Sequence, residues 1–143
     1  MKRAARAISG WWRRWFGPKP LGLRGEDAAA GHLRRLGYRI LLRNGRSKLG
    51  EIDIVALDGD TIVFVEVKTR VSDTAAHPEE FVDAAKQRRL TRLGLAFLKR
   101  RRLLGRPARF DVVAVTWLAE SRRPQIEHFP NAFASAGPGG FFT

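Results

Sequence analysis

The sequence predicts a mixed α/β domain in which a central β-sheet is covered by helices. Segments with helical and strand-like hydrophobic patterns follow one another in the order α-β-β-β-α-β-β. The strand segments are apolar at consecutive positions, which is typical of a sheet that is buried on both faces. The 143 residues, of which 44% are hydrophobic, suffice for one domain with a core of its own.

A helix and three strands are expected in the first half of the domain. Apolar residues recur at helical spacing over residues 25–36, and Gly37 is placed to end this helix. Glu26 lies on the apolar stripe, so its side chain is expected to point toward the sheet. A polar loop is expected over residues 44–50. The strands are expected over residues 38–43, 51–57 and 61–68, with the hairpin turn Gly59-Asp60 between the last two.

A long helix and two strands are expected in the second half. A loop over residues 71–78 leads to the helix, which is expected over residues 79–104. Lys86 lies on the apolar stripe of this helix between Val82 and Leu90, so it is also expected to point inward. The last strands are expected over residues 109–118 and 125–129.

Two flexible segments are expected to flank the domain of residues 25–129. Residues 1–24 form a basic arm with interleaved Trp and Arg, and residues 130–143 form a tail rich in Gly, Ala and Ser. The arm can lie on a membrane surface, grip nucleic acid or have no dedicated role. No stable membrane span is expected, because no apolar run approaches about 18 residues, and Arg6 interrupts any secretory signal.

Ionisable residues stand inside the two most apolar strands. Asp53 lies between two isoleucines, Glu66 lies between two valines, and Lys68 follows two residues later. Charged side chains are almost never buried unless they are paired or bind a metal. A two-residue turn places Asp53 opposite Glu66 and Glu51 opposite Lys68, on the same face of the hairpin. This pattern predicts a functional site in the hairpin.

Two facing carboxylates repel each other, and a divalent cation removes that cost. A set of oxygen ligands without cysteine favours Mg²⁺ or Mn²⁺. Lys68 on the same face can orient an attacking water or stabilise charge that develops on a phosphoryl group. Glu26 can supply a third carboxylate, and Lys86 and Gln87 can reach the site from the long helix. These are the minimal parts for hydrolysis of a phosphodiester.

Three alternatives compete with this interpretation. Asp53 and Glu66 can accept hydrogen bonds from arginines without a metal. Glu51 and Lys68 can form an ordinary cross-strand ion pair. A register slip of one residue would place Asp53 and Glu66 on opposite faces of the sheet.

Seven short segments, in this order along residues 25 to about 129, carry a resemblance to a known family. They are Gly25-Glu26, Gly37-Tyr38, Asn44, Gly50-Glu51-Ile52-Asp53, Phe64-Val65-Glu66-Val67-Lys68-Thr69-Arg70, Lys86-Gln87 and Arg109-Phe110-Asp111-Val112-Val113. Together they resemble the PD-(D/E)xK restriction-endonuclease-like superfamily. Within it they most resemble the YraN family of small bacterial proteins, which are similar to archaeal Holliday-junction resolvases.

The resemblance implies a restriction-endonuclease-like core, in which a central mixed sheet is flanked by helices on both faces. Ile52 stands where the name of the superfamily has Pro, a substitution that is common in the resolvase-like branch. The fold resemblance by itself does not imply junction resolution. The implied roles are metal ligation for Asp53 and Glu66, catalysis for Lys68, and support of the site for Glu26, Lys86 and Gln87.

The charge of the chain indicates a polyanionic partner. The formal net charge is +13, and residues 1–24 and 86–110 hold seven and ten Lys or Arg with no acid. Nucleic acid is the expected partner of so basic a chain, although Arg-rich surfaces can also be merely solvated. The arginines expected to contact nucleic acid are Arg70, Arg88, Arg89, Arg92, Arg100 and Arg101.

The function expected from the sequence is a Mg²⁺- or Mn²⁺-dependent endonuclease acting on DNA, with branched or flap DNA among its substrates. The alternative is a nucleic-acid-binding accessory protein of DNA repair or recombination that does not cleave. The absence of cysteine excludes disulfides and thiol nucleophiles and fits a cytoplasmic protein. Both a monomer and a homodimer are compatible with the sequence.

Overall fold

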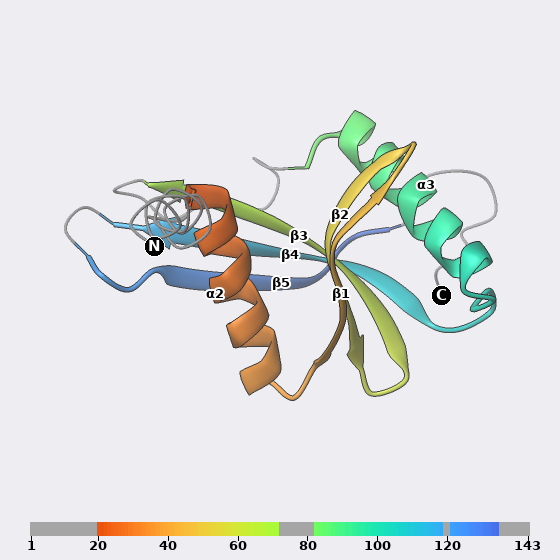
Figure 1. The fold of residues 1–143 in the computed structure, drawn as a ribbon, viewed down its shortest axis with the longest axis horizontal. Coiled ribbons are helices and arrows are strands. Elements are labelled where there is room, and N and C mark those ends of the chain that lie inside the picture. Colours follow the sequence, from red (N-terminus) through yellow and green to blue (C-terminus); the bar gives the residue numbers. More distant parts are fainter. Residues whose placement is uncertain (1–19, 72–81, 119–120, 135–143) are drawn as a thin grey trace, which may run out of the picture.

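The structure is a computed structural model that describes residues 20–71, 82–118 and 121–134. These residues form one five-stranded sheet of order β1-β2-β3-β4-β5 with a helix on each face (Figure 1). The element order is the predicted one. The elements are α2 (Leu21–Arg35), β1 (Arg39–Ser47), β2 (Gly50–Asp58), β3 (Thr61–Val71), α3 (Ala84–Arg100), β4 (Ala108–Trp117) and β5 (Gln125–Phe133).

The two helices differ in extent from the prediction. α2 begins at Leu21, directly after Pro20, so residues 21–24 belong to the helix and not to the expected arm. α3 begins only at Ala84, because the Asp83 side chain accepts a hydrogen bond from the Lys86 N–H and caps the helix there. It ends at Arg100, short of the predicted residue 104, and Arg102 then adopts a positive φ of 56°.

The outer strands are longer than predicted. β1 continues to Ser47, so most of the expected loop over residues 44–50 is strand that pairs with β2. β5 continues to Phe133, so the start of the expected tail is part of the sheet. Residues 1–19, 72–81 and 135–143, which carry most of the expected arm, loop and tail, lie outside the described residues. None of the helices in the described part is long and apolar enough to cross a membrane.

Two apolar cores cover the faces of the sheet. Ala29, Ala30 and Leu33 of α2 pack on one face, and Leu90 and Leu93 of α3 pack on the other. β3 and β4 are parallel and are joined through α3, whereas the other neighbouring strands are antiparallel. Both faces are therefore buried, as the continuous apolar character of the strands predicts.

The hairpin β2–β3 has the predicted register over its first half. Its ladder runs from the pair Asp58–Thr61 to the pair Ile54–Val65, and the turn is Gly59-Asp60. The ladder ends at the pair Ile54–Val65, so the predicted cross-strand pair of Asp53 and Glu66, the next positions, is not part of it. The predicted pairing of Glu51 with Lys68 is wrong, because the first residues of β2 pair with β1 alone.

Strand β2 changes orientation where it leaves β3. Residues two apart in a regular strand share a face. Ile52 nevertheless packs in the core under α3, whereas Ile54 packs in the core under α2. The tip of the β1–β2 hairpin therefore curls toward α3 (Figure 1), where the Cβ position at Gly50 lies 3.5 Å from Leu93 Cδ1.

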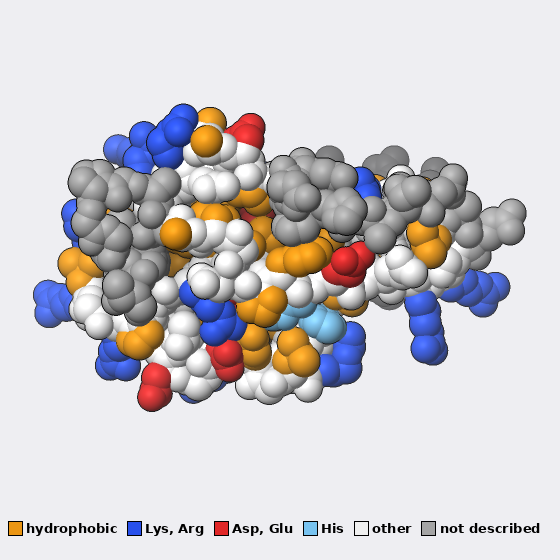
Figure 2. Space-filling model, turned by 180° about the vertical axis from the view of Figure 1, so that it is seen from behind, with side chains coloured by type: hydrophobic (Ala, Val, Ile, Leu, Met, Phe, Trp, Pro, Cys, Tyr) orange, Lys and Arg blue, Asp and Glu red, His pale blue; other side chains and the backbone are white. Residues whose placement is uncertain are grey.

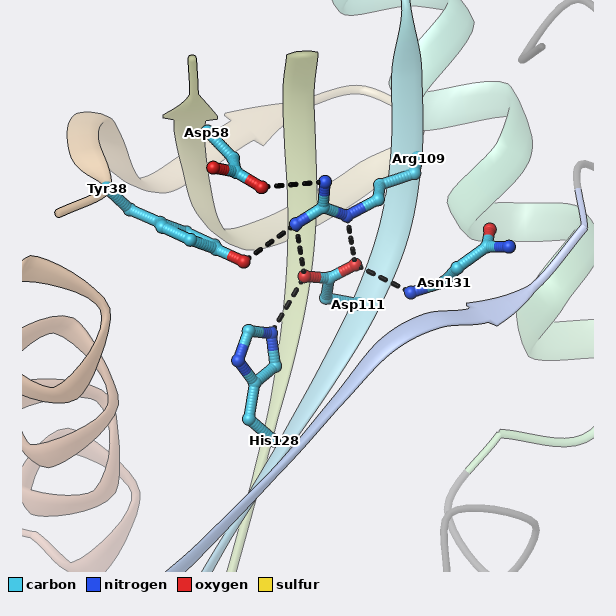
Figure 3. Close-up of polar contacts among 6 residues, drawn as sticks. All are labelled: Tyr38, Asp58, Arg109, Asp111, His128 and Asn131. Carbon is cyan, nitrogen blue, oxygen red and sulfur yellow. Dashed lines mark hydrogen bonds and ion pairs between the residues drawn. The ribbon is translucent and has the colours of Figure 1, made fainter. Parts of the chain in front are cut away.

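A buried polar network ties β4 to β5 and to the segment after α2 (Figure 3). The Asp111 side chain, which is 0% exposed, accepts hydrogen bonds from Arg109 Nε at 2.9 Å and from the Asn131 N–H at 2.9 Å, and its Oδ2 lies 2.8 Å from His128 Nε2. Arg109 also donates to Tyr38 Oη at 2.7 Å. The pKa of Asp111 is lowered, because these partners outweigh the effect of burial.

Replacing Asp111 with Asn is expected to lower the free energy of unfolding at pH 7 by about 1–3 kcal/mol, since Arg109 would lose its buried partner and keep only the ion pair with Asp58 at 3.0 Å. The lowered pKa makes the Asp111 contribution complete above the unfolded-state pKa, near 3.9. It is lost as the pH falls through the lower folded-state pKa, so the difference between the two proteins should shrink below about pH 4. Urea unfolding of both proteins at several pH values measures this difference in the free energy of unfolding.

The matched control is Asp60→Asn, because Asp60 is exposed in the hairpin turn. This variant should remain within about 0.5 kcal/mol of the unsubstituted protein. Equal stability of the Asp111 and Asp60 variants at pH 7 would show that the network does not hold the sheet together.

Candidate functional site

The candidate site lies where β2 separates from β3. Beyond the last ladder pair, the Asp53 carboxylate accepts a hydrogen bond from the Val67 N–H at 2.8 Å. The Asp53 side chain thus accepts the hydrogen bond that a backbone carbonyl of β2 would accept in a regular ladder. Asp53 is half-buried, and Glu66 on the neighbouring strand is only 8% exposed. Both charges therefore lie inside the fold rather than on its surface.

Three carboxylates converge at this point. One oxygen each from Glu26, Glu51 and Asp53 lies within 4.8 Å of the others. The side-chain amide of Asn44 on β1 lies against the same acids. With its nitrogen turned toward them, it donates to Glu26 Oε1 at 2.5 Å and to Glu51 Oε1 at 2.9 Å. Asn44 has a positive φ of 55°, a conformation that Asn tolerates better than most residues. The cluster thus draws on α2, β1 and β2.

Close packing of α2 on the sheet brings Glu26 to the cluster. A Cβ at Gly25 would lie 1.7 Å from Thr69 Oγ1 and 2.7 Å from Thr69 Cβ, so only glycine allows the helix to approach β3 this closely. Asp27, the residue after Glu26, accepts a hydrogen bond from Arg43 at 2.7 Å and ties the same turn of α2 to β1. Glu26 lies between these two contacts.

Burial is the main cause of the pKa shifts of two of these carboxyls. Burial, with the Glu66 charge next, raises the pKa of Asp53 to about 7. Burial also raises the pKa of Glu26; the Arg43 charge opposes this shift, and the charge of Glu51 adds to it. The charged forms of Asp53 and Glu26 are therefore less stable here than in water.

Two lysines lie on the other side of the cluster. Lys86 Nζ is 2.5 Å and Lys68 Nζ is 3.8 Å from the same oxygen of Glu66, Oε1. The cap formed by Asp83 fixes the first turn of α3 and thereby the position of Lys86. Contact with Lys86, followed by burial, lowers the pKa of Lys68. Although burial opposes it, the hydrogen bonds with Glu66 and Lys68 raise the pKa of Lys86.

The structure brings together five of the six residues predicted for the catalytic and metal sites. These five are Glu26, Asp53, Glu66, Lys68 and Lys86. The sixth, Gln87, donates to the Val82 carbonyl at 3.2 Å and contacts the start of α3. One alternative interpretation expected arginines to pair with Glu66. Its partners in the structure are the two lysines, Lys68 and Lys86.

Glu51 and Asn44 are the residues that sequence reasoning missed. The predicted register places Glu51 opposite Lys68, with an ion pair between them as one alternative. In the structure Glu51 instead forms an ion pair with Arg46 at 3.6 Å and joins the carboxylate cluster. The side chain of Asn44 was assigned to a loop without a role. Two signals pointed to them, namely a second acid within two residues of Asp53 and a polar residue that favours positive φ before β2.

The arginines predicted to contact nucleic acid lie mostly on the outer surface of α3 and just beyond its end. Arg70 is half-buried on β3, next to Thr69. The exposed ones are Arg88, Arg89, Arg92, Arg100 and Arg101.

Comparison with known proteins identifies relatives over most of the chain. The family described as "Uncharacterised protein family UPF0102" matches residues 25–115, a range that includes every residue of the site. A UPF0102 protein of Geobacter sulfurreducens is 52% identical over 118 residues, which are 82% of this chain and 91% of the relative. One of Moorella thermoacetica is 56% identical over 109 residues, 76% and 91% of the two chains. One of Rhodopirellula baltica is 46% identical over 125 residues, which are 85% of this chain and 75% of the relative.

Replacing Gly25 with Ala is expected to lower the free energy of unfolding by about 1–3 kcal/mol, because the added methyl group forces α2 away from Thr69. Gly22 on the same helix is the matched control, since a Cβ there meets nothing within 4 Å. Gly22→Ala should raise stability by up to about 1 kcal/mol through helix propensity. Urea unfolding measures both, and equal effects would refute the close approach of α2.

Proposed function

We propose that this chain, which belongs to the YraN-like UPF0102 family, is a divalent-cation-dependent nuclease that hydrolyses phosphodiester bonds in DNA. The observation that carries the proposal is the group of four carboxylates with two lysines at the point where β2 leaves β3. The resemblance to the PD-(D/E)xK superfamily points to five of these six residues, all except Glu51. The relatives share the family and leave the reaction open.

The chemistry of the donor set fits Mg²⁺ or Mn²⁺. The three converging side chains offer only carboxylate oxygens, which are the ligands that these hard cations prefer. Asp53, whose pKa is raised to about 7, gains most from a nearby positive charge. Glu26, Glu51 and Asp53 would hold the ion. Both ion pairs of Glu66 use Oε1, so its second oxygen can complete the ligand set.

The lysines supply the second half of the proposed mechanism. The cation, when bound, acts as a Lewis acid on the phosphoryl group and favours deprotonation of the attacking water. Lys68, whose Nζ lies 3.8 Å from Glu66 Oε1, orients that water and as a cation stabilises the charge that develops on the phosphate oxygens. Lys86 remains charged and holds Glu66 in place.

The basic surface supports nucleic acid as the substrate. The chain carries a net charge of +13, and Lys and Arg project from several sides of the face shown in Figure 2, with acidic side chains lying singly among them. Neutralisation of phosphates by such side chains releases counterions and gives affinity that falls steeply with salt. The basic surface of α3 starts near the site, because Arg88 follows Lys86 by two residues on this helix.

The test is a cleavage panel of linear, flap and four-way DNA with Mg²⁺ and with Mn²⁺. Asp53→Asn and Lys68→Ala are each expected to lower the cleavage rate at least about 100-fold, since each removes a group that stabilises the transition state. Salt-dependent DNA binding by both variants should persist, because the basic surface is unchanged.

The control in this panel is Asp60→Asn, an exposed acid in the turn of the same hairpin, which should cleave as the unsubstituted protein does. Cleavage that survives both site substitutions would contradict the proposal and indicate a contaminant. Salt-dependent binding without cleavage of any substrate would favour the alternative, a non-catalytic accessory protein.

Cation binding can be tested without a substrate. Mn²⁺ should raise the thermal unfolding midpoint of the unsubstituted protein, because a ligand that binds only the folded state stabilises it. Glu51→Gln, chosen because Glu51 joins the cluster, should weaken Mn²⁺ binding at least about tenfold, as loss of a charged ligand does. Unchanged Mn²⁺ affinity in this variant would remove Glu51 from the ligand set.

A further inference from the structure

A hollow on the surface lies between α3 and the tip of the β1–β2 hairpin, beside the carboxylate cluster. Its floor is apolar and is formed by Leu42, Ile52, Leu93 and Phe97. Its cavity volume is about 80 Å³, and the space between its walls reaches about 460 Å³ when the open solvent at its mouth is counted. A duplex cannot enter so small a space, whereas the edge of one flat ring can.

Three arginines rim this hollow, which we call the arginine-rimmed pocket. Arg46 comes from β1, and Arg100 and Arg101 come from the end of α3. All three are exposed. An apolar floor below a ring of cations suits a ligand that combines an apolar ring with phosphate groups, and a nucleotide is such a ligand.

The floor contains an aromatic platform. The Phe97 ring packs against Phe64 in a T-shaped arrangement with ring centroids 5.7 Å apart, and this contact fixes its orientation. The Arg101 guanidinium lies 5.3 Å from the Phe97 centroid. Bases stack both on aromatic side chains and on guanidinium planes, and such contacts tolerate any base because every base has a flat face.

The pocket adjoins the candidate metal site. Arg46 of the rim pairs with Glu51 of the carboxylate cluster at 3.6 Å, although Ile52 of the floor points to the opposite face of β2 from Glu51 and Asp53. A strand with one base on the floor and its next phosphate at Arg46 would therefore pass beside Glu51.

We propose that the arginine-rimmed pocket binds one unpaired nucleotide of a DNA strand next to the bond to be cut. The proposal rests on the proposed nuclease function and names its substrate class, DNA with a single-stranded segment at the site. A paired base would first have to leave the duplex, which costs a few kcal/mol, so unpaired DNA binds in preference. Arg46 and Arg100 contact the phosphates on either side of the bound base, whereas Arg101, which lies over the Phe97 ring, stacks against the base.

The experiment measures stacking directly, in Ca²⁺ so that binding is observed without cleavage. A 5′-flap DNA carries 2-aminopurine at the first unpaired position, and a blunt duplex carries it at the same place in the sequence. The flap probe is expected to lose fluorescence on binding, because stacking on Phe97 quenches it, and to bind at least about fivefold more tightly than the duplex.

Two variants test the pocket. Phe97→Leu keeps an apolar contact with Phe64 and removes the stacking face, so quenching and the preference for the flap should both be lost. Ala96 also lines the pocket, and Ala96→Leu fills it while Phe97 is kept, so the same losses are expected. This second variant provides the test if Phe97→Leu does not fold. Arg92→Ala, on the same helix outside the pocket, should weaken binding of flap and duplex alike.

The outcomes separate this inference from the proposed function. Quenching by the unsubstituted protein that is lost in Ala96→Leu supports the pocket, even if no cleavage is found with any cation. Equal affinity for flap and duplex, or quenching that persists in Ala96→Leu, overturns the pocket, and cleavage that depends on Asp53 would then leave the nuclease standing.

Discussion

The hydrogen bond from the Val67 N–H to the Asp53 carboxylate is the contact on which the site depends. The ladder between β2 and β3 ends at Ile54 and Val65, and a buried N–H without a partner would cost about 1–3 kcal/mol. The Asp53 side chain satisfies it and lets the β2 backbone turn away toward α3. That turn opens room for Glu51 and Glu26 beside Asp53 and leaves Glu66 facing the lysines of β3 and α3.

The same arrangement places an energetic burden on the fold. Burial, followed by the charge of Glu66, raises the pKa of Asp53, and other contacts hold the parts of the site in place. Gly25 admits α2 to within contact of Thr69, and Asp83 fixes the first turn of α3. Elsewhere in the sheet, the buried Asp111 carboxylate has a polar partner at each oxygen and links β4 to β5. A cation would relieve the remaining repulsion.

Much of this could be predicted from local patterns. The hairpin turn sets the register of β2 and β3 by counting, and the apolar stripe of α3 places Lys86 inward, so both were found from the sequence. The loss of register at Asp53 could not be found, because strand patterns assume a regular ladder and nothing in Ile52-Asp53-Ile54 marks the change of face. Glu51 was therefore assigned to the wrong partner. The contacts of Asn44 and Asp111 depend on residues distant in sequence, and periodicity carries no information about them.

The most direct test of the central claim is a crystal structure of the protein with Mn²⁺, with the ion located by its anomalous scattering. The separation of β2 from β3 at Asp53 predicts one strong peak within bonding distance of Asp53 and of at least one of Glu26 and Glu51. A saturated crystal without a peak at these carboxylates, or with Mn²⁺ only elsewhere on the molecule, would contradict it.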